Sequence, residues 1–470
     1  MSSSIPSGAT NGNTEKAPHV LIAGGGLAGL FLGNLLEKAG ISYTIYERTA
    51  QIKPLGAIMC LSPNILPAFE QLGLYEELMS FSKISRLNTF YTDKLKLVGK
   101  AEATNSEQIG YDRILLARPP LYDMLFGKIP AHKIHLSKKL VSHEQDQMGV
   151  RVYFEDGTVA EGDILVGADG AHSGVRESLY KTLEKQGLLP KIDSANAKKG
   201  YISLVGTTDS LNPAEYPSMN YTEAENSFII GDGDTPYTWV TFTVPDNKIC
   251  WCVIVQLEEA SAEEKHALTS AWETQDNQKA LDKIRHFKTT YGTLGDLFDA
   301  TPTERVSKVY FEDKLYQTWN HDRTVLIGDA AHKLLPSTGA GAVNALQDAV
   351  ILANCLYDIQ PHTFTNAKDA LNEYKAQRFK AVAEQYPKSY MSARLQYGHT
   401  LWERILRYVI FNWLPNSVIG AQLVKDSAYR PQANFLPQAP KRGTIDVLPQ
   451  KASRHIQKEE ETRRANTAGL

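Results

Sequence analysis

The chain has 470 residues, of which 42% are hydrophobic and 22% charged, and its formal net charge is −3. That length exceeds what one compact core usually holds and predicts two or three packed units. The lack of a basic excess excludes a protein built to neutralise nucleic-acid phosphates, and the ordinary apolar content excludes a disordered acidic chain.

The N-terminal segment and the cysteines indicate an intracellular protein. The first 17 residues are rich in Ser, Gly, Asn and Thr and lack the apolar core of a signal peptide, so we expect a disordered tail. The cysteines form no C-x-x-C pair and are few for this length, so we expect neither a disulfide framework nor a metal site. They are Cys60, Cys250, Cys252 and Cys355. We therefore expect a protein that is not secreted, either cytoplasmic or peripheral on an internal membrane.

The first apolar stretch has the pattern of a βαβ unit. Val20–Ala23 is a short apolar run, Leu27–Ala39 has helical spacing, and Tyr43–Tyr46 is a second β-rich run. Strand, helix and strand in this order predict the opening of a parallel sheet.

A G-x-G-x-x-G turn joins the first strand to the helix of this unit. Its glycines, Gly24, Gly26 and Gly29, let the backbone approach a pyrophosphate at the helix N-terminus. Glu47 ends the second strand eighteen residues after Gly29, where a carboxylate can accept hydrogen bonds from ribose hydroxyls. The motif predicts dinucleotide binding but does not choose between FAD and NAD.

The middle of the chain is rich in β-forming residues. Its four runs are Gly200–Thr208, Ser227–Gly231, Tyr237–Val244 and Ile249–Leu257. The last run is apolar on both faces, so its sheet must be covered on both sides, and we expect a second domain whose sheet roofs a pocket. Tyr221 and Tyr237 are the catalytic candidates there, as groups that orient a substrate or polarise an epoxide, although strand tyrosines are commonly core or rim residues.

Two further strands end in acidic loops. One ends at Asp169-Gly170 and is followed by Ser173 and Arg176; the other, Thr324–Ile327, ends at Gly328-Asp329. An aspartate at a strand end can bind a ribityl hydroxyl, and amides at a following helix start can face a flavin ring carbonyl. Asp169 and Arg176 could instead form a structural ion pair. His332, shortly after Asp329, is interpreted as a packing and hydrogen-bonding residue of its loop, not as a base.

The rest of the chain is expected to be mainly helical. A helix is predicted from about Gly341 to Tyr357, and Asn366–Leu423 has helical character. Ile405–Val424 is apolar but is interrupted by polar residues and a proline, so we reject a membrane span and keep contact with a membrane surface open.

At these motifs the chain resembles the group A flavoprotein monooxygenases, which have the p-hydroxybenzoate-hydroxylase-like fold. The glycine turn, the Asp169-Gly170 motif with Ser173 and Arg176, and the Gly328-Asp329 motif follow that family's order and spacing from Val20 to about Leu356. The chain looks closest to the fungal branch that epoxidises prenyl or polyprenyl chains or oxidises indole alkaloids. The residues that carry this second resemblance include Glu47-Arg48, Pro54–Ala57, Arg118 and Tyr429–Gln432.

The resemblance implies an α/β protein, α+β overall, with a Rossmann-like FAD-binding domain, a β-sheet substrate domain and a helical C-terminal region. The expected division is a tail at 1–17, the FAD domain at 18–190 plus 303–365, the substrate domain at 191–302, the helical region at 366–437 and a second tail at 438–470. The implied cofactor-binding residues are Gly24, Gly26, Gly29, Glu47, Arg48, Gly56, Ala57, Arg118, Asp169, Arg176, Asp329, Gly341 and Ala342.

The resemblance also implies the reaction. NAD(P)H, with NADPH as the expected co-substrate, would reduce FAD, and a C4a-hydroperoxyflavin formed with O₂ would epoxidise or hydroxylate a lipophilic prenylated or terpenoid secondary metabolite. Two alternatives stay open. An aromatic-ring hydroxylase of the same family would have a basic, polar pocket floor, and a flavin-binding protein without oxygenase activity would not be reduced by NADPH.

Overall fold

A computed structural model describes residues 18–51, 58–195, 198–231, 237–256, 277–398, 400–413 and 416–468. Its first sheet has the order β20-β21-β12-β1-β2-β8, with all neighbours parallel except β20 and β21. The strands are β1 (His19–Ala23), β2 (Ser42–Tyr46), β8 (Ile134–His135), β12 (Ile164–Gly167), β20 (Asn320–His321) and β21 (Thr324–Leu326). The predicted βαβ opening of a parallel sheet is confirmed.

The helix α1 (Leu27–Ala39) packs between this sheet and α11 (Ala340–Tyr357). Its core side chains, such as Leu30 and Phe31, are fully buried, which explains why a helix with so few polar residues is stable there. Gly40 ends the helix in the left-handed conformation, with φ of 69°, and its N–H reaches the last carbonyls.

Small sheets and helices surround the first sheet. Two three-stranded sheets have the orders β11-β10-β9 and β3-β7-β4. Their strands are β3 (Ile58–Leu61), β4 (Lys83–Ile84), β7 (Ile114–Ala117), β9 (Leu140–Gln145), β10 (Val150–Phe154) and β11 (Val159–Gly162). The accompanying helices are α2 (Leu66–Gln71), α3 (Tyr75–Ser80), α4 (Ser106–Ile109), α5 (Arg118–Gly127), α6 (Gly174–Lys185) and α7 (Lys191–Ser194), with the 3₁₀ helix η1 (Ala131–Lys133).

The second sheet has eight strands in the order β22-β19-β13-β16-β15-β14-β5-β6. These are β5 (Leu87–Thr92), β6 (Leu97–Glu102), β13 (Lys198–Thr207), β14 (Asn226–Ile230), β15 (Tyr237–Val244), β16 (Lys248–Gln256), β19 (Ser307–Leu315) and β22 (His332–Lys333). Four of its strands, β5, β6, β19 and β22, come from the two segments that the sequence assigns to the first domain. They join this sheet because β5 pairs in parallel with β14 and β19 pairs antiparallel with β13.

Both faces of this sheet are covered, as the sequence predicts. Ile249, Trp251 and Val253 of β16 belong to a cluster with α9 (Asn277–Ile284) and α10 (Leu294–Asp299). Ile254 of β16 belongs to a second cluster on the opposite face, with Tyr397, the last residue of α12 (Phe364–Tyr397). The remaining short elements here are η2 (Pro217–Asn220), β17 (Lys288–Thr289), β18 (Gly292–Thr293) and η3 (Thr303–Arg305).

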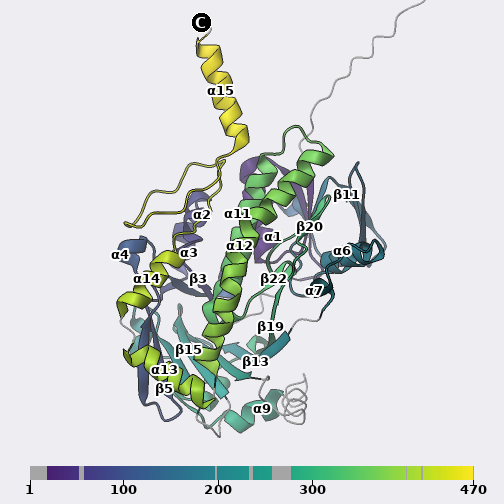
Figure 1. Cartoon of the computed structure of the whole chain (residues 1–470). Helices are drawn as coiled ribbons and strands as arrows, with labels where there is room; N and C mark the ends of the chain where they lie inside the picture. Colours follow the sequence, from purple (N-terminus) through teal and green to yellow (C-terminus); the bar gives the residue numbers. More distant parts are fainter. Residues whose placement is uncertain are drawn as a thin grey trace, which may run out of the picture.

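One long helix connects the two sheets. α12 (Phe364–Tyr397) has 34 residues and runs beside α11 from β20 of the first sheet to the apolar face of the second (Figure 1). Because it contacts both sheets, α12 fixes one against the other. Two 3₁₀ helices, η4 (Gly328–Ala330) and η5 (Pro336–Thr338), occupy the loop before α11.

The C-terminal part comprises α13 (Leu401–Trp413), α14 (Asn416–Asp426) and α15 (Arg454–Ala468). In Figure 1, α15 projects from the body, whereas α13 lies beside the second sheet. The segment before α15, expected as a tail, is held on the body by contacts such as Arg442 with Glu70 at 2.7 Å and Lys451 with Glu373 at 2.5 Å. Within the ranges that the structure covers, none of the helices combines the length and the apolar character that a bilayer crossing requires.

Candidate functional site

The glycine turn after β1 brings three segments of backbone together. Gly24 has a φ of 106°, and a Cβ there would lie 2.4 Å from the carbonyl oxygen of Ala168. A Cβ on Gly29 would lie 2.1 Å from the carbonyl oxygen of Gly24, whereas one on Gly26 would meet nothing within 4 Å. The first and third glycines therefore allow the tight turn and close packing, and the second leaves open space for a ligand to approach the backbone.

Glu47 fixes this turn from the end of β2. Its Oε2 accepts a hydrogen bond from the Gly25 N–H at 2.7 Å, and its Oε1 accepts one from the Thr49 N–H at 2.9 Å. Tyr122 of α5 holds the other side of the turn, because its hydroxyl donates to the Gly25 carbonyl at 2.5 Å. Burial, and next the charge of Glu47, raise the pKa of the Tyr122 phenol, so it stays a donor at neutral pH.

The turn opens onto a cleft of about 830 Å³ at the carboxyl ends of β1, β2 and β12. In an open parallel sheet this is the edge where nucleotides bind. Six of the residues that the sequence predicts for the cofactor line it: Gly24, Gly26, Glu47, Arg48, Arg118 and Asp169. Sequence reasoning missed several other lining residues, among them Tyr122, Lys138, Lys139 and His172.

Asp169 supplies an unused acceptor to this cleft. Its Oδ2 accepts from the Val175 N–H at 3.1 Å, whereas its Oδ1 is buried and has no hydrogen-bond partner among the described residues. Burial raises the pKa of the carboxyl group. A buried acceptor without a partner is costly, and a ligand hydroxyl would satisfy it.

Arg176 lies shortly after Asp169 in the chain, but its side chain does not line the cleft. It begins α6 below the cap Ser173, and its guanidinium donates to the carbonyls of Ala330 at 3.0 Å and Ala171 at 2.7 Å. The guanidinium also lies 4.5 Å from the ring centroid of Tyr316. Arg176 thus joins the two acidic loops to each other, and its direct contact with a cofactor stays a prediction.

Arg118 and Asp329 carry opposite charges at the far end of the site. Arg118 begins α5, and its burial lowers the pKa of the guanidinium while the negative charge of Asp329 opposes that shift. The side chain of Asp329 is exposed in η4. An acid that reaches solvent beside a partly desolvated cation can bind both a hydroxyl and a phosphate of one extended ligand.

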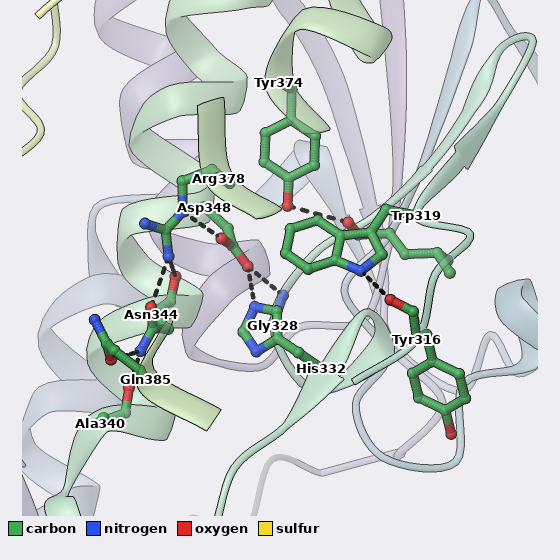
Figure 2. Close-up of polar contacts among 11 residues, drawn as sticks. Tyr316, Trp319, Gly328, His332, Ala340, Asn344, Asp348, Tyr374, Arg378 and Gln385 are labelled. Atoms are coloured by element: carbon green, nitrogen blue, oxygen red, sulfur yellow. Dashed lines mark hydrogen bonds and ion pairs between the residues drawn. The ribbon is translucent and has the colours of Figure 1, made fainter. Parts of the chain in front are cut away.

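A fully buried ionic network holds the backbone of Gly328, the residue before Asp329 (Figure 2). Asp348 of α11 is 0% exposed, and its Oδ2 accepts from the Gly328 N–H at 2.9 Å and from His332 Nε2 at 2.6 Å. Its Oδ1 accepts from Nε of Arg378, on α12, at 2.7 Å. Since the carboxylate is an acceptor, Nε2 of His332 carries the proton.

The network continues toward the start of α11. Arg378 Nη2 donates to Oδ1 of Asn344 at 2.8 Å, and Asn344 Nδ2 donates to the Ala340 carbonyl at 2.9 Å and to Gln385 at 2.7 Å. Burial alone would raise the pKa of Asp348, but the charges and hydrogen bonds of His332 and Arg378 outweigh it and lower the pKa. The network therefore holds η4 and the N-terminus of α11 in one fixed relation. The interpretation of His332 as a packing and hydrogen-bonding residue agrees with this geometry.

Four further residues are predicted to bind the cofactor, and none of those that the structure describes is among the residues that line the cleft. Gly341 and Ala342 lie at the half-buried start of α11, near the loop where Gly339 approaches Cys60 of β3. Gly56 and Ala57 lie outside the described residues.

Neither catalytic candidate lies in the cleft lining. Tyr221 is 58% exposed at the end of η2. Tyr237 packs against Phe287, with ring centroids 5.6 Å apart, in the cluster covered by α9 and α10, on the face opposite α12. Neither tyrosine contacts the cofactor cleft, and a catalytic role for either one stays a prediction.

A local signal existed for one missed residue only. Tyr122 follows Arg118 by four positions, a spacing that places both residues on one face of a helix such as α5. Lys138, Lys139 and Arg378 reach the site through contacts between distant segments, which spacing does not reveal.

Together these features fit FAD. The open approach at Gly26, the buried acceptor of Asp169 and the opposite charges of Asp329 and Arg118 match the pyrophosphate and hydroxyl groups of an extended flavin dinucleotide. The fold and the cleft thus define an FAD-binding flavoprotein.

Comparison with known proteins makes the assignment narrower. The model of a family described as "FAD binding domain" matches residues 18–387, so the chain belongs to this family. Its relatives show that it is an FAD-dependent monooxygenase. The chain is 29% identical to FAD-dependent monooxygenase ausM of Penicillium brasilianum, over 89% of this chain and 87% of that protein. It is 30% identical to FAD-dependent monooxygenase ptmM of Penicillium ochrochloron, over 80% of this chain and 89% of that protein.

Its fold is similar to that of Klebsiella pneumoniae HpxO, solved with FAD and uric acid. The TM-score is 0.70 at 20% identity, over 88% of this chain and 97% of that chain. The assignment to group A flavoprotein monooxygenases, near the fungal branch, is confirmed, and FAD is the cofactor.

Proposed function

We propose that the protein uses NAD(P)H and O₂ to insert one oxygen atom into a lipophilic, prenylated or terpenoid secondary metabolite, by epoxidation or hydroxylation. The substrate, NAD(P)H, H⁺ and O₂ would give the oxygenated product, NAD(P)⁺ and water. When bound, FAD supplies the redox chemistry that accepts a hydride and activates O₂. The protein's task is to hold the cofactor, orient the substrate and exclude water.

The observation that carries this proposal is the apolar face that the second sheet turns toward α12. Phe90, Phe228 and Ile230 are buried there with Leu335, which precedes η5 and the start of α11. The resemblance puts the flavin edge at Gly341 and Ala342, so this aromatic and aliphatic face adjoins the expected place of reaction. An apolar surface of this kind suits a prenyl chain better than a small aromatic acid.

The cofactor roles follow from the cleft. We propose that Gly24 and Gly26 face the pyrophosphate, that Glu47 accepts hydrogen bonds from the adenosine ribose, and that Arg48 borders the same end. Asp169 and Asp329 would accept hydrogen bonds from hydroxyls of the extended dinucleotide, with Arg118 near its phosphates. Because the substrate side is apolar, water is kept from the reacting centre, which limits unproductive loss of activated oxygen as peroxide.

The test is product mass with an isotope label. Purified protein with NADPH and ¹⁸O₂ is offered prenylated indoles, farnesylated and geranylgeranylated phenolics, and a matched set of aromatic acids. We expect one labelled oxygen in a prenylated product and NADPH consumption that depends on that substrate. Labelled hydroxylation of the aromatic acids alone would favour the ring hydroxylase and refute the lipophilic substrate.

A further inference from the structure

The helix α13 attaches to the protein through its charged side. Glu403 and Arg407, one helical turn apart, are 4% and 5% exposed. Glu403 Oε1 accepts from Arg394 Nε at 2.5 Å, and its Oε2 accepts from the Thr400 hydroxyl at 2.8 Å. Arg407 donates to the Leu395 carbonyl at 2.7 Å and to the Gly398 carbonyl at 2.5 Å, at the end of α12. Ionic and hydrogen-bonding contacts therefore fix this helix.

The opposite side of α13 is apolar and faces outward. Trp402 is 78% exposed, Trp413 75% and Leu401 68%, although such side chains normally face the core. With a period of 3.6 residues per turn, the exposed apolar residues form one continuous arc away from Glu403 and Arg407. The arc consists of Leu401, Trp402, Ile405, Leu406, Tyr408, Val409 and Trp413. We call it the α13 apolar face.

The α13 apolar face continues onto neighbouring elements. β6 lies against both α13 and α14, and it adds the exposed Leu97, while α14 adds the exposed Val418. Figure 1 shows α13 at the same edge of the molecule as β5. An exposed apolar area formed by several elements marks a surface that binds another protein, a membrane or a ligand.

Basic side chains border this area. The exposed cations on the β5–β6 hairpin and on α14 are Lys94, Lys96, Lys100 and Lys425. The acids nearby are Asp93, Glu102 and Asp426, and Asp426 is already paired with Lys388 at 2.7 Å. The border therefore carries an excess of positive charge. A second copy of this chain would bring these cations against one another, whereas an anionic lipid surface would neutralise them.

We propose that α13 is a membrane-docking helix that lies in the surface of an anionic bilayer with Trp402 and Trp413 at headgroup depth. Tryptophan is enriched at this level of membranes, because its ring is apolar while its N–H can reach water. The charged residues Glu403 and Arg407 of α13 face the protein and its apolar residues face outward. This is the orientation that a helix lying in a membrane surface needs. This docking does not depend on which substrate the enzyme oxidises.

The experiment is vesicle flotation with the full-length, FAD-loaded protein. We expect flotation with vesicles of phosphatidylcholine and phosphatidylserine, and weaker flotation with phosphatidylcholine alone or at high salt. W402S/W413S should reduce the partition coefficient about tenfold or more, because two large interfacial side chains are lost. K96E/K100E should weaken binding to the phosphatidylserine vesicles only. The matched control M148S/L188S removes two exposed apolar side chains from another part of the surface and should float like the wild type.

A spectroscopic readout separates docking from misfolding. In a Trp272→Phe background, brominated phosphatidylcholine should quench the fluorescence of the otherwise wild-type protein but not that of W402F/W413F, since the other three tryptophans, Trp239, Trp251 and Trp319, are buried. All variants should keep the visible FAD spectrum. Undiminished flotation of W402S/W413S would overturn the proposal. So would a wild type that never floats but is a dimer by light scattering and becomes a monomer in that variant, which would assign the α13 apolar face to a second copy of the chain.

Discussion

Replacement of Asp348 by asparagine tests whether the buried network holds the cofactor loop. The carboxylate accepts three hydrogen bonds, from Gly328, His332 and Arg378, at 2.9, 2.6 and 2.7 Å. An asparagine has one acceptor oxygen, so its NH₂ must face either the Gly328 N–H or Arg378 Nε. Both of these are donors, and either arrangement leaves a buried donor without a partner.

The size of the effect follows from burial. Both Asp348 and Arg378 are 0% exposed, and removal of one partner of such a pair typically costs about 3 to 5 kcal/mol, because an uncompensated charge remains inside the protein. We expect Asp348→Asn to lower the free energy of unfolding by that amount. Since Gly328 adjoins Asp329, we also expect FAD to bind about tenfold more weakly, which corresponds to about 1.4 kcal/mol.

Urea unfolding of the apoprotein gives the first quantity, and FAD titration followed by flavin fluorescence gives the second. The double variant D348N/R378Q removes both charges and should be less destabilised than the sum of the single variants. Glu77→Gln is a matched control, because it makes the same chemical change in a half-exposed pair with Lys128 and should alter neither quantity appreciably. A loss below about 1 kcal/mol with unchanged FAD affinity would refute the reasoning.

Three further predictions concern single positions. Gly24→Ala should abolish FAD binding or folding, because its Cβ would lie 2.4 Å from the Ala168 carbonyl oxygen; full visible absorbance of the purified variant would contradict this. Arg118→Gln should weaken FAD binding more than tenfold and make it less sensitive to salt, as titrations at two salt concentrations would show. Burial lowers the pKa of His143 to about 4, so between that pH and about 6.5 the unfolded state binds more protons than the folded state. The free energy of unfolding should therefore fall by up to roughly 3 kcal/mol as the pH falls through this window. Unfolding measured at pH 7 and pH 5 should differ less in His143→Gln, and an equal difference would exclude His143 as the cause.

Local sequence patterns determined the cofactor turn. The spacing of Gly24, Gly26 and Gly29 between a strand and a helix, with Glu47 after the next strand, allows one geometry, and the structure has it. The two-sided apolar pattern of β16 likewise specified a sheet covered on both faces. These features depend on neighbours within a few residues or on strand alternation, and both are visible in a sequence.

Only the tertiary structure decided where the polar groups point. The alternation of side chains along β15 predicts that Tyr237 and Val240 lie on opposite faces of the sheet. It does not predict that α9 and α10 cover the face of Tyr237 and that α12 covers the face of Val240. The pairing of Asp348 with Arg378 joins two helices, and Arg176 turns to the Ala330 carbonyl 154 positions away. Glu403 and Arg407 are buried because the end of α12 offers them Arg394 and free carbonyls. Such contacts join segments that are distant along the chain, so their partners are fixed by packing and not by spacing.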